Sequence, residues 1–145
     1  MSAPSPGPVT SDLVLRLLLP EDRVMQVPCR VGYDPAAPYE VSATFATTEG
    51  DVAWVLARDL LRAGLDAPVG EGDVVVWPSR GPDGPQVCLT LSSPSGRALL
   101  EAERGEVEEF LRRTDEAVPP GSESEFLDLD AVVSRLLDAG EAPYV

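Results

Sequence analysis

The side chains that most enzymes use for acid–base and nucleophilic chemistry are missing from this sequence. It contains no His and no Lys, so a Ser/His pair, a Cys/His pair and a Ser–Lys dyad cannot form. Paired carboxylates remain, and the nearest pairs are Glu123 with Glu125 and Asp128 with Asp130. Both pairs fall in a predicted loop or helix start, where the helix dipole favours acids. We therefore predict no catalytic residue and no enzymatic activity.

The glycine and cysteine motifs give no sign of a cofactor or a metal. Gly70 and Gly72 lack the third glycine, the Lys and the following helix of a phosphate-binding loop, and they predict a turn. The acidic clusters do not match the spacing of a calcium loop. Cys29 and Cys88 lie in apolar, strand-like segments, which predicts two reduced, buried thiols. We expect no cofactor and no metal site.

Length and charge limit the class of protein further. The chain has 145 residues and 43% hydrophobic residues, which fits one domain. Its 25 acids and 11 arginines give a formal charge of -14, which opposes binding to nucleic acid and to anionic lipid. Residues 101–145 carry 13 of the acids. This acidic third is either a solvated helical surface or a contact surface for a basic partner.

Two further features concern location. No apolar segment approaches the roughly 20 residues of a membrane-spanning helix, so we expect no direct membrane insertion. The first residues do not form a signal peptide, and we expect a cytoplasmic protein.

Hydrophobic periodicity predicts three strands and a helix in the first half of the chain. The strands are expected at 12–19, 24–32 and 39–46, and the helix at 49–63. Pro28 marks the second strand as an edge strand or a bulge, because proline cannot donate to a ladder. Thr48 and Asp51 fit a capping box, and Gly64 fits the end of the helix.

The second half repeats this order. Strands are expected at 73–79, 86–92 and 95–103, followed by helices over 106–117 and 128–139. The pattern predicts an α+β fold built from two strand-rich units. We expect a single domain over residues 11–140, between a disordered tail at 1–10 and a short tail at 141–145.

Several residues are candidates for an interface. The predicted helix 49–63 is apolar around most of its circumference, which favours the core or a subunit interface. Its tryptophan and the later one could instead stack nucleic-acid bases. We expect Arg58 and Asp59 to be exposed, either as part of an interface or in a surface ion pair or a helix-end contact. The candidate interface residues are Trp54, Arg58, Asp59, Trp77 and Arg113.

Short motifs occur in a specific order along the chain. They include Tyr33-Asp34-Pro35, Pro38-Tyr39, Thr44-Phe45, Trp54, Ala57-Arg58-Asp59-Leu60-Leu61, Gly72-Asp73-Val74, Val76-Trp77-Pro78, Leu91-Ser92-Ser93-Pro94, Arg113-Thr114, Val118-Pro119-Pro120-Gly121 and Glu123. Together they resemble the SsgA-like family, which is tied to sporulation-specific cell division in filamentous actinobacteria. The resemblance spans residues 12–137.

The resemblance implies a fold and a function that the residue types alone do not. The family fold is similar to the Whirly-type single-strand-binding fold, which agrees with the antiparallel β-sheets and the three helices predicted above. A homotrimer is the assembly that the family resemblance implies. The implied function is non-enzymatic: marking sporulation septum sites at the cell septum and recruiting the tubulin-like division protein FtsZ. The implied partners are FtsZ and other SsgA-like proteins. Two alternatives remain open. One is single-stranded nucleic-acid binding, which the charge of -14 opposes. The other is a scaffold role in peptidoglycan remodelling.

Overall fold

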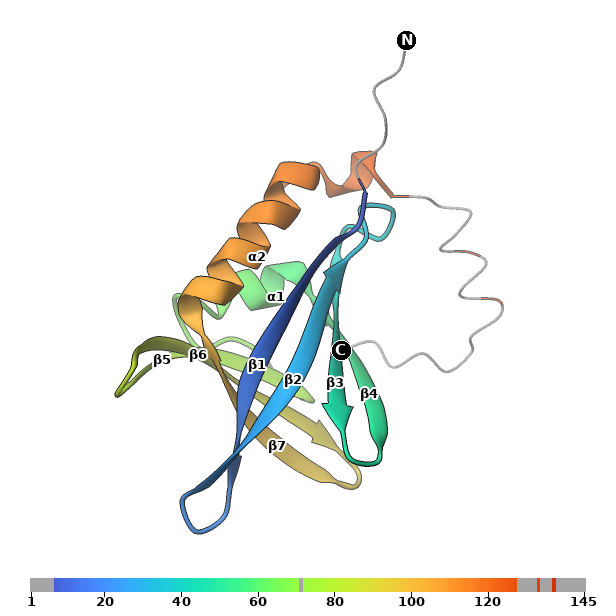
Figure 1. Ribbon diagram of the computed structural model, residues 1–145. Coiled ribbons are helices and arrows are strands. Elements are labelled where there is room, and N and C mark those ends of the chain that lie inside the picture. The colour runs from blue at the N-terminus through green and yellow to red at the C-terminus, as the bar shows by residue number, and fades with distance from the viewer. Residues whose placement is uncertain (1–6, 71, 128–132, 134–136, 138–145) are drawn as a thin grey trace.

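The protein is built around one antiparallel sheet. A computed structural model describes residues 7–70, 72–127, 133 and 137 (Figure 1). The sheet has seven strands in the order β4-β3-β2-β1-β7-β6-β5. Their bounds are β1 Val9–Leu19, β2 Arg23–Tyr33, β3 Glu40–Thr47, β4 Gly50–Ala57, β5 Val74–Gly81, β6 Gly84–Ser93 and β7 Gly96–Glu103.

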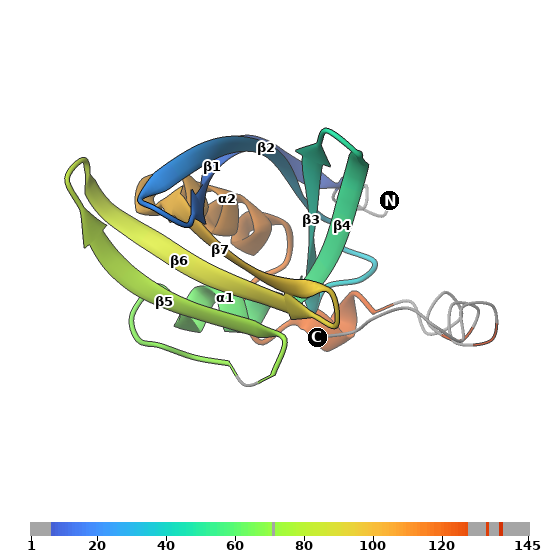
Figure 2. The same ribbon diagram turned by 90° about the horizontal axis from the view of Figure 1, so that it is seen from below.

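The helices lie on the concave face of this sheet. They are α1 Arg58–Ala63 and α2 Arg104–Ala117, and the short 3-10 helix η1 Glu123–Glu125 follows α2 in the chain. Figure 2 shows the strands curving around the space that α2 occupies. The stripe of α2 that faces the sheet is buried, namely Val107, Phe110, Leu111 and Thr114. This stripe matches the predicted helix 106–117, and the amphipathic spacing explains it.

The two strand-rich units join into one sheet. Strands β1–β4 precede α1, and strands β5–β7 precede α2. The ladder between the units is short, since β1 pairs with β7 only at Arg16 with Glu101 and Leu17 with Leu100. The expectation of two units is therefore confirmed, but the first unit has four strands rather than three.

The extra strand comes from the segment 49–63, where the predicted helix was wrong. Residues 50–57 form β4, and only the last six residues of the prediction are helical, as α1. Inward-facing and outward-facing residues of β4 are both apolar, so a strand and an all-round apolar helix give the same pattern. The supposed capping box is a hairpin turn in which Gly50 has a φ of +113° and Thr47 Oγ1 donates to the Gly50 carbonyl.

Two other expectations also change. Strand β2 is an interior strand between β1 and β3, so the prediction of an edge strand was wrong. Its pairing with β3 runs from Cys29 to Gly32, so Pro28 lies just outside the stretch that needs a donor. The predicted helix 128–139 falls almost wholly outside the described residues.

Candidate interaction surface

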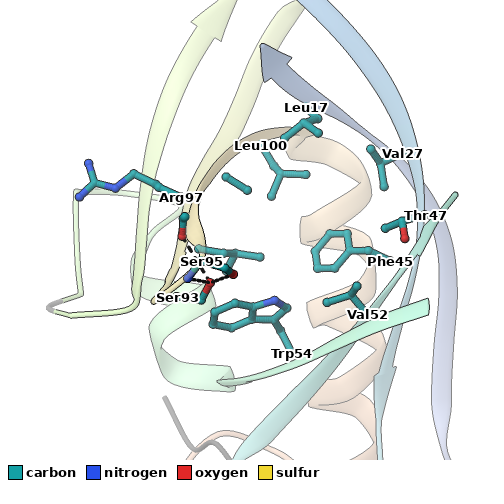
Figure 3. A pocket seen from close by; sticks show the side chains of 13 residues that line it. Leu17, Val27, Phe45, Thr47, Val52, Trp54, Ser93, Ser95, Arg97 and Leu100 are labelled. Carbon is teal, nitrogen blue, oxygen red and sulfur yellow. Dashed lines mark hydrogen bonds between the residues drawn. The ribbon is translucent and has the colours of Figure 1, made fainter. Parts of the chain in front are cut away.

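The concave face of the sheet is divided into two halves. In the covered half, α1 and α2 bury strand residues such as Leu13, Val31 and Val41. In the open half, the strands continue beyond the helices and line a pocket of about 340 Å³. Figure 3 shows this pocket, whose apolar lining includes Leu17, Val27, Phe45, Val52, Trp54 and Leu100. Phe45 borders both halves, because it also lines the core beneath α2.

Trp54 lies at the side of the open half, on β4. The register pairs it with Ala43, and its neighbour Val52 on the same face pairs with Phe45. Figure 3 shows the indole ring beside Val52 at the edge of the pocket. Trp54 is half-buried and Val52 is 45% exposed. The open half is thus an apolar surface next to a sheet edge, and such patches on a small protein commonly mark binding sites.

Polar groups lie at the rim of the pocket. The hydroxyls of Ser93 and Ser95 lie 2.9 Å apart at the tip of the β6–β7 hairpin. Arg97 follows them on β7, and Figure 3 shows its guanidinium pointing away from the apolar side chains. An apolar floor with a polar rim is the usual anatomy of a protein-binding patch.

Arg58 is buried in the covered half, so the expectation that it is exposed was wrong. Only 1% of it is accessible. Its Nη1 donates to the carbonyl of Val118 at 2.8 Å and to that of Thr114 at 3.2 Å. Its Nη2 donates to Glu123 Oε2 at 2.9 Å, and its guanidinium lies 4.9 Å from the centre of the Tyr33 ring. Arg58 therefore ties the start of α1 to the end of α2 and to η1, which explains its burial.

A second arginine reinforces this anchor. Arg62 donates to both oxygens of Asp115, at 2.8 and 2.6 Å, and Asp115 also lies 3.3 Å from Arg58 Nη1. The hydrogen bonds that Arg62 donates to Asp115 raise the pKa of Arg62. The two arginines and Asp115 thus hold α1 against α2 as a charged cluster.

Glu123 and Tyr33 take their properties from the same cluster. Hydrogen bonds from its own backbone N–H and then from Arg58 hold the pKa of Glu123 below its usual value. Burial raises the pKa of the Tyr33 hydroxyl to about 12, and that hydroxyl donates to the carbonyl of Pro38. Glu123 is buried and paired with Arg58 while Glu125 is exposed, so these two acids do not form a catalytic pair.

The other candidate interface residues are dispersed. Asp59 is exposed at the start of α1. Trp77 is half-buried on β5, where it pairs with Cys88 on the opposite face from Val76. Arg113 on α2 donates to the Thr10 carbonyl and to Ser11 Oγ, both at 2.9 Å. The five candidates therefore do not form one patch.

Sequence reasoning missed the partners of Arg58. Tyr33, Thr114, Val118 and Glu123 all belong to the motifs that carried the family resemblance, and they converge on one guanidinium. The signal was present in those motifs. The incorrect helix over 49–63, however, placed Arg58 on its narrow polar arc instead of at the sheet-to-helix junction.

The two cysteines and the glycines at positions 70 and 72 have structural roles. Cys29 and Cys88 are free and buried, as predicted, and burial raises the pKa of the Cys29 thiol to about 11. Gly70 and Gly72 have φ of +110° and +85°, which confirms the turn. Within the described ranges, no three His, Cys, Asp or Glu side chains gather as metal ligands would. The helices in those ranges are too short or too polar to cross a bilayer.

Fold and surface together define a small, sheet-dominated α+β domain with an apolar open face. A family described as Streptomyces sporulation and cell division protein SsgA matches residues 27–123. The chain belongs to this SsgA family.

Individual relatives extend the match. The sporulation-specific cell division protein SsgB of Streptomyces coelicolor is 52% identical over 130 residues, covering 89% of this chain and 95% of that protein. SsgB of Frankia casuarinae is 48% identical over 133 residues, covering 91% and 93%. The family resemblance seen in the sequence is thereby confirmed, with a role in sporulation-specific cell division.

Solved structures of the family share the fold. A structure from work on SsgB and longitudinal cell division in Streptomyces coelicolor has a TM-score of 0.82 at 49% identity, covering 87% of this chain and 100% of that one. An SsgA-like sporulation-specific cell division protein from Thermobifida fusca has a TM-score of 0.81 at 35% identity, covering 93% and 99%.

Proposed function

We propose that this protein is a non-enzymatic division protein that marks sporulation septum sites and recruits FtsZ to them. The observation that supports this most is the similarity to proteins named SsgB along almost the whole chain. The Whirly-like description of the fold, assembly as a homotrimer and contacts with other SsgA-like proteins belong to the same proposal.

The open half of the concave face is the surface that we assign to partner binding. It combines an apolar pocket with Trp54, and tryptophan is over-represented among residues that dominate binding energy. The covered half is unsuitable for binding because Arg58 and its partners are buried there. A formal charge of -14 disfavours a nucleic-acid partner.

Co-sedimentation with polymerised FtsZ tests the proposal. The full-length protein is expected to pellet with the polymer, and Trp54→Ala is expected to weaken this association. Trp77→Ala is the matched control, because it removes the same side chain from another half-buried strand position outside the pocket. Equal binding by Trp54→Ala and the native protein would remove the open half from the proposal. Failure of the native protein to pellet at several salt concentrations would count against direct recruitment.

A further inference from the structure

The edge of the sheet at β4 is open. No strand among the described residues pairs with the outer side of β4, which is eight residues long. Its sequence from Val52 to Ala57 is apolar and contains no proline and no charge. Natural proteins usually protect such an edge, because its free N–H and C=O groups can pair with another chain.

The register shows which main-chain groups of β4 point away from β3. The Arg58 N–H donates to the Tyr39 carbonyl at 2.9 Å, and the β3–β4 ladder continues this alignment. Directions alternate along an antiparallel strand, so every second residue from Arg58 faces β3. The N–H and C=O groups of the residues between them face the open edge. These residues are Asp51, Ala53, Val55 and Ala57.

The opposite edge of the sheet is protected. On β5, Val76 exchanges two hydrogen bonds of 2.9 Å with Val69 from the preceding loop. Pro78 lies two residues further along, at the next outward-facing position, and has no N–H to offer. Of the two sheet edges, β4 is therefore the one that can accept another strand.

The apolar pocket lies directly inside the open edge. Val52 and Trp54 line it from β4 itself. A strand added along β4 would place every second side chain on the concave face, beside these two residues. Main-chain pairing would then supply affinity and the pocket would supply side-chain selection, as in other cases of strand addition.

The acidic residues at the two ends of β4 determine which kind of strand can pair with its edge. Glu49 and Asp51 are exposed at the start of β4, and Asp59 is exposed just beyond its end. Antiparallel pairing of β4 with β4 of a second copy would bring these acidic ends together, which is unfavourable. An extended segment with basic residues near its ends would meet them favourably.

We propose that β4 binds an extended segment of a partner protein by strand addition. The segment would carry alternating apolar residues, one of which enters the pocket beside Trp54, and Lys or Arg near its ends. This inference concerns the mode of binding and holds whether or not FtsZ is the partner.

A proline substitution at position 55 tests directly whether the partner binds by strand addition. Val55→Pro removes an outward N–H but leaves the hydrogen bonds to β3 in place, and proline is tolerated at such edge positions. Val55→Thr is the matched control, because it keeps the N–H and the β-branched shape. Circular dichroism and thermal unfolding of both variants show whether they remain folded. Ala53→Pro removes another outward N–H and serves as the second blocking variant.

The probe is a library of short random peptides selected on the full-length native protein. Selected peptides are expected to show alternating apolar residues with basic ends. Their affinity should fall about tenfold or more on Val55→Pro and stay unchanged on Val55→Thr. Amide exchange at Ala53 and Val55 should slow when a selected peptide is bound.

Three results would overturn the inference. One is the absence of enriched peptides, and another is equal affinity of the enriched peptides for native protein and Val55→Pro. The third is a native oligomer, whether a dimer or the proposed homotrimer, that Val55→Pro dissociates, because another copy of the chain would then occupy the edge. Failure of FtsZ to co-sediment while peptides still bind would overturn the recruitment proposal and leave this one in place.

Discussion

The two halves of the concave face are built from similar apolar strands, but one half forms the core and the other forms an apolar pocket. In the covered half, two helices and the buried guanidinium of Arg58 complete the core. In the open half, the same strands continue beyond α1 and α2, and Trp54 is half-buried at the sheet edge. The comparison teaches that the motifs which identify the family need not mark its working surface. Four residues of these motifs meet around Arg58, where they hold the fold together: Tyr33, Thr114, Val118 and Glu123.

The largest expected effect is the loss of the anchor. Arg58→Ala should destabilise the protein by about 3–5 kcal/mol, because it removes the guanidinium that donates to the buried carboxylate of Glu123 and to the carbonyl of Val118. Urea unfolding measures the change. Arg112→Ala is the control, since Arg112 is exposed and solvent screens its ion pairs with Glu109 and Glu116, so that they should contribute little to stability. Similar losses in both variants would refute the anchor.

The second prediction concerns the open half. Trp54→Ala should weaken binding to polymerised FtsZ by more than tenfold, as expected for an aromatic hot spot. Its stability should fall by about 2 kcal/mol, because the ring is half-buried rather than fully buried. Binding titrations and urea unfolding of the same preparation separate the two effects. A variant that unfolds readily but binds normally when folded would place Trp54 with the core instead.

The fold was largely predictable because most elements have unambiguous periodicity. Strand β3 alternates clearly, and α2 has a clean apolar stripe. Segment 49–63 failed because β4 is apolar on both sides, so that neither period excludes the other.

The site was less predictable than the fold. Tyr33 and Glu123 are far apart in the sequence, and nothing in their spacing indicates that both meet Arg58. The pocket depends on where the helices stop covering the sheet, which is a property of tertiary packing. Of the predicted interface residues, Trp54 lines the pocket, whereas Arg58 serves the core.

The third prediction concerns the pair of Arg58 and Glu123 and the pH dependence of stability. The pKa of Glu123 is lowered in the folded protein from 4.5. Its contribution is thus fully present above pH 4.5 and is lost as the pH falls through the lowered pKa. Glu123→Gln should cost about 1–2 kcal/mol at pH 7 and flatten the acid limb of stability. Urea unfolding from pH 7 to pH 3 checks this, and an unchanged acid limb would show that the charge of Glu123 contributes little.

The smallest effect is expected at Arg113, which lies outside both features of the comparison. Arg113→Ala removes hydrogen bonds to Thr10 and Ser11 and should cost less than about 1 kcal/mol. FtsZ binding should not change. Calorimetry and co-sedimentation measure the two quantities. A selective loss of binding would extend the interface to α2 and weaken the contrast between the two halves.

The distinction between a partner-binding open half and a structural covered half is tested most directly by amide hydrogen exchange. The exchange of the full-length protein is measured with and without polymerised FtsZ. Exchange is expected to slow on binding at Ala53 and Val55, whose N–H groups face the open edge, and to stay unchanged around Thr114, which contacts Arg58. Slowing confined to α2, with unchanged exchange at Ala53 and Val55, would contradict this distinction.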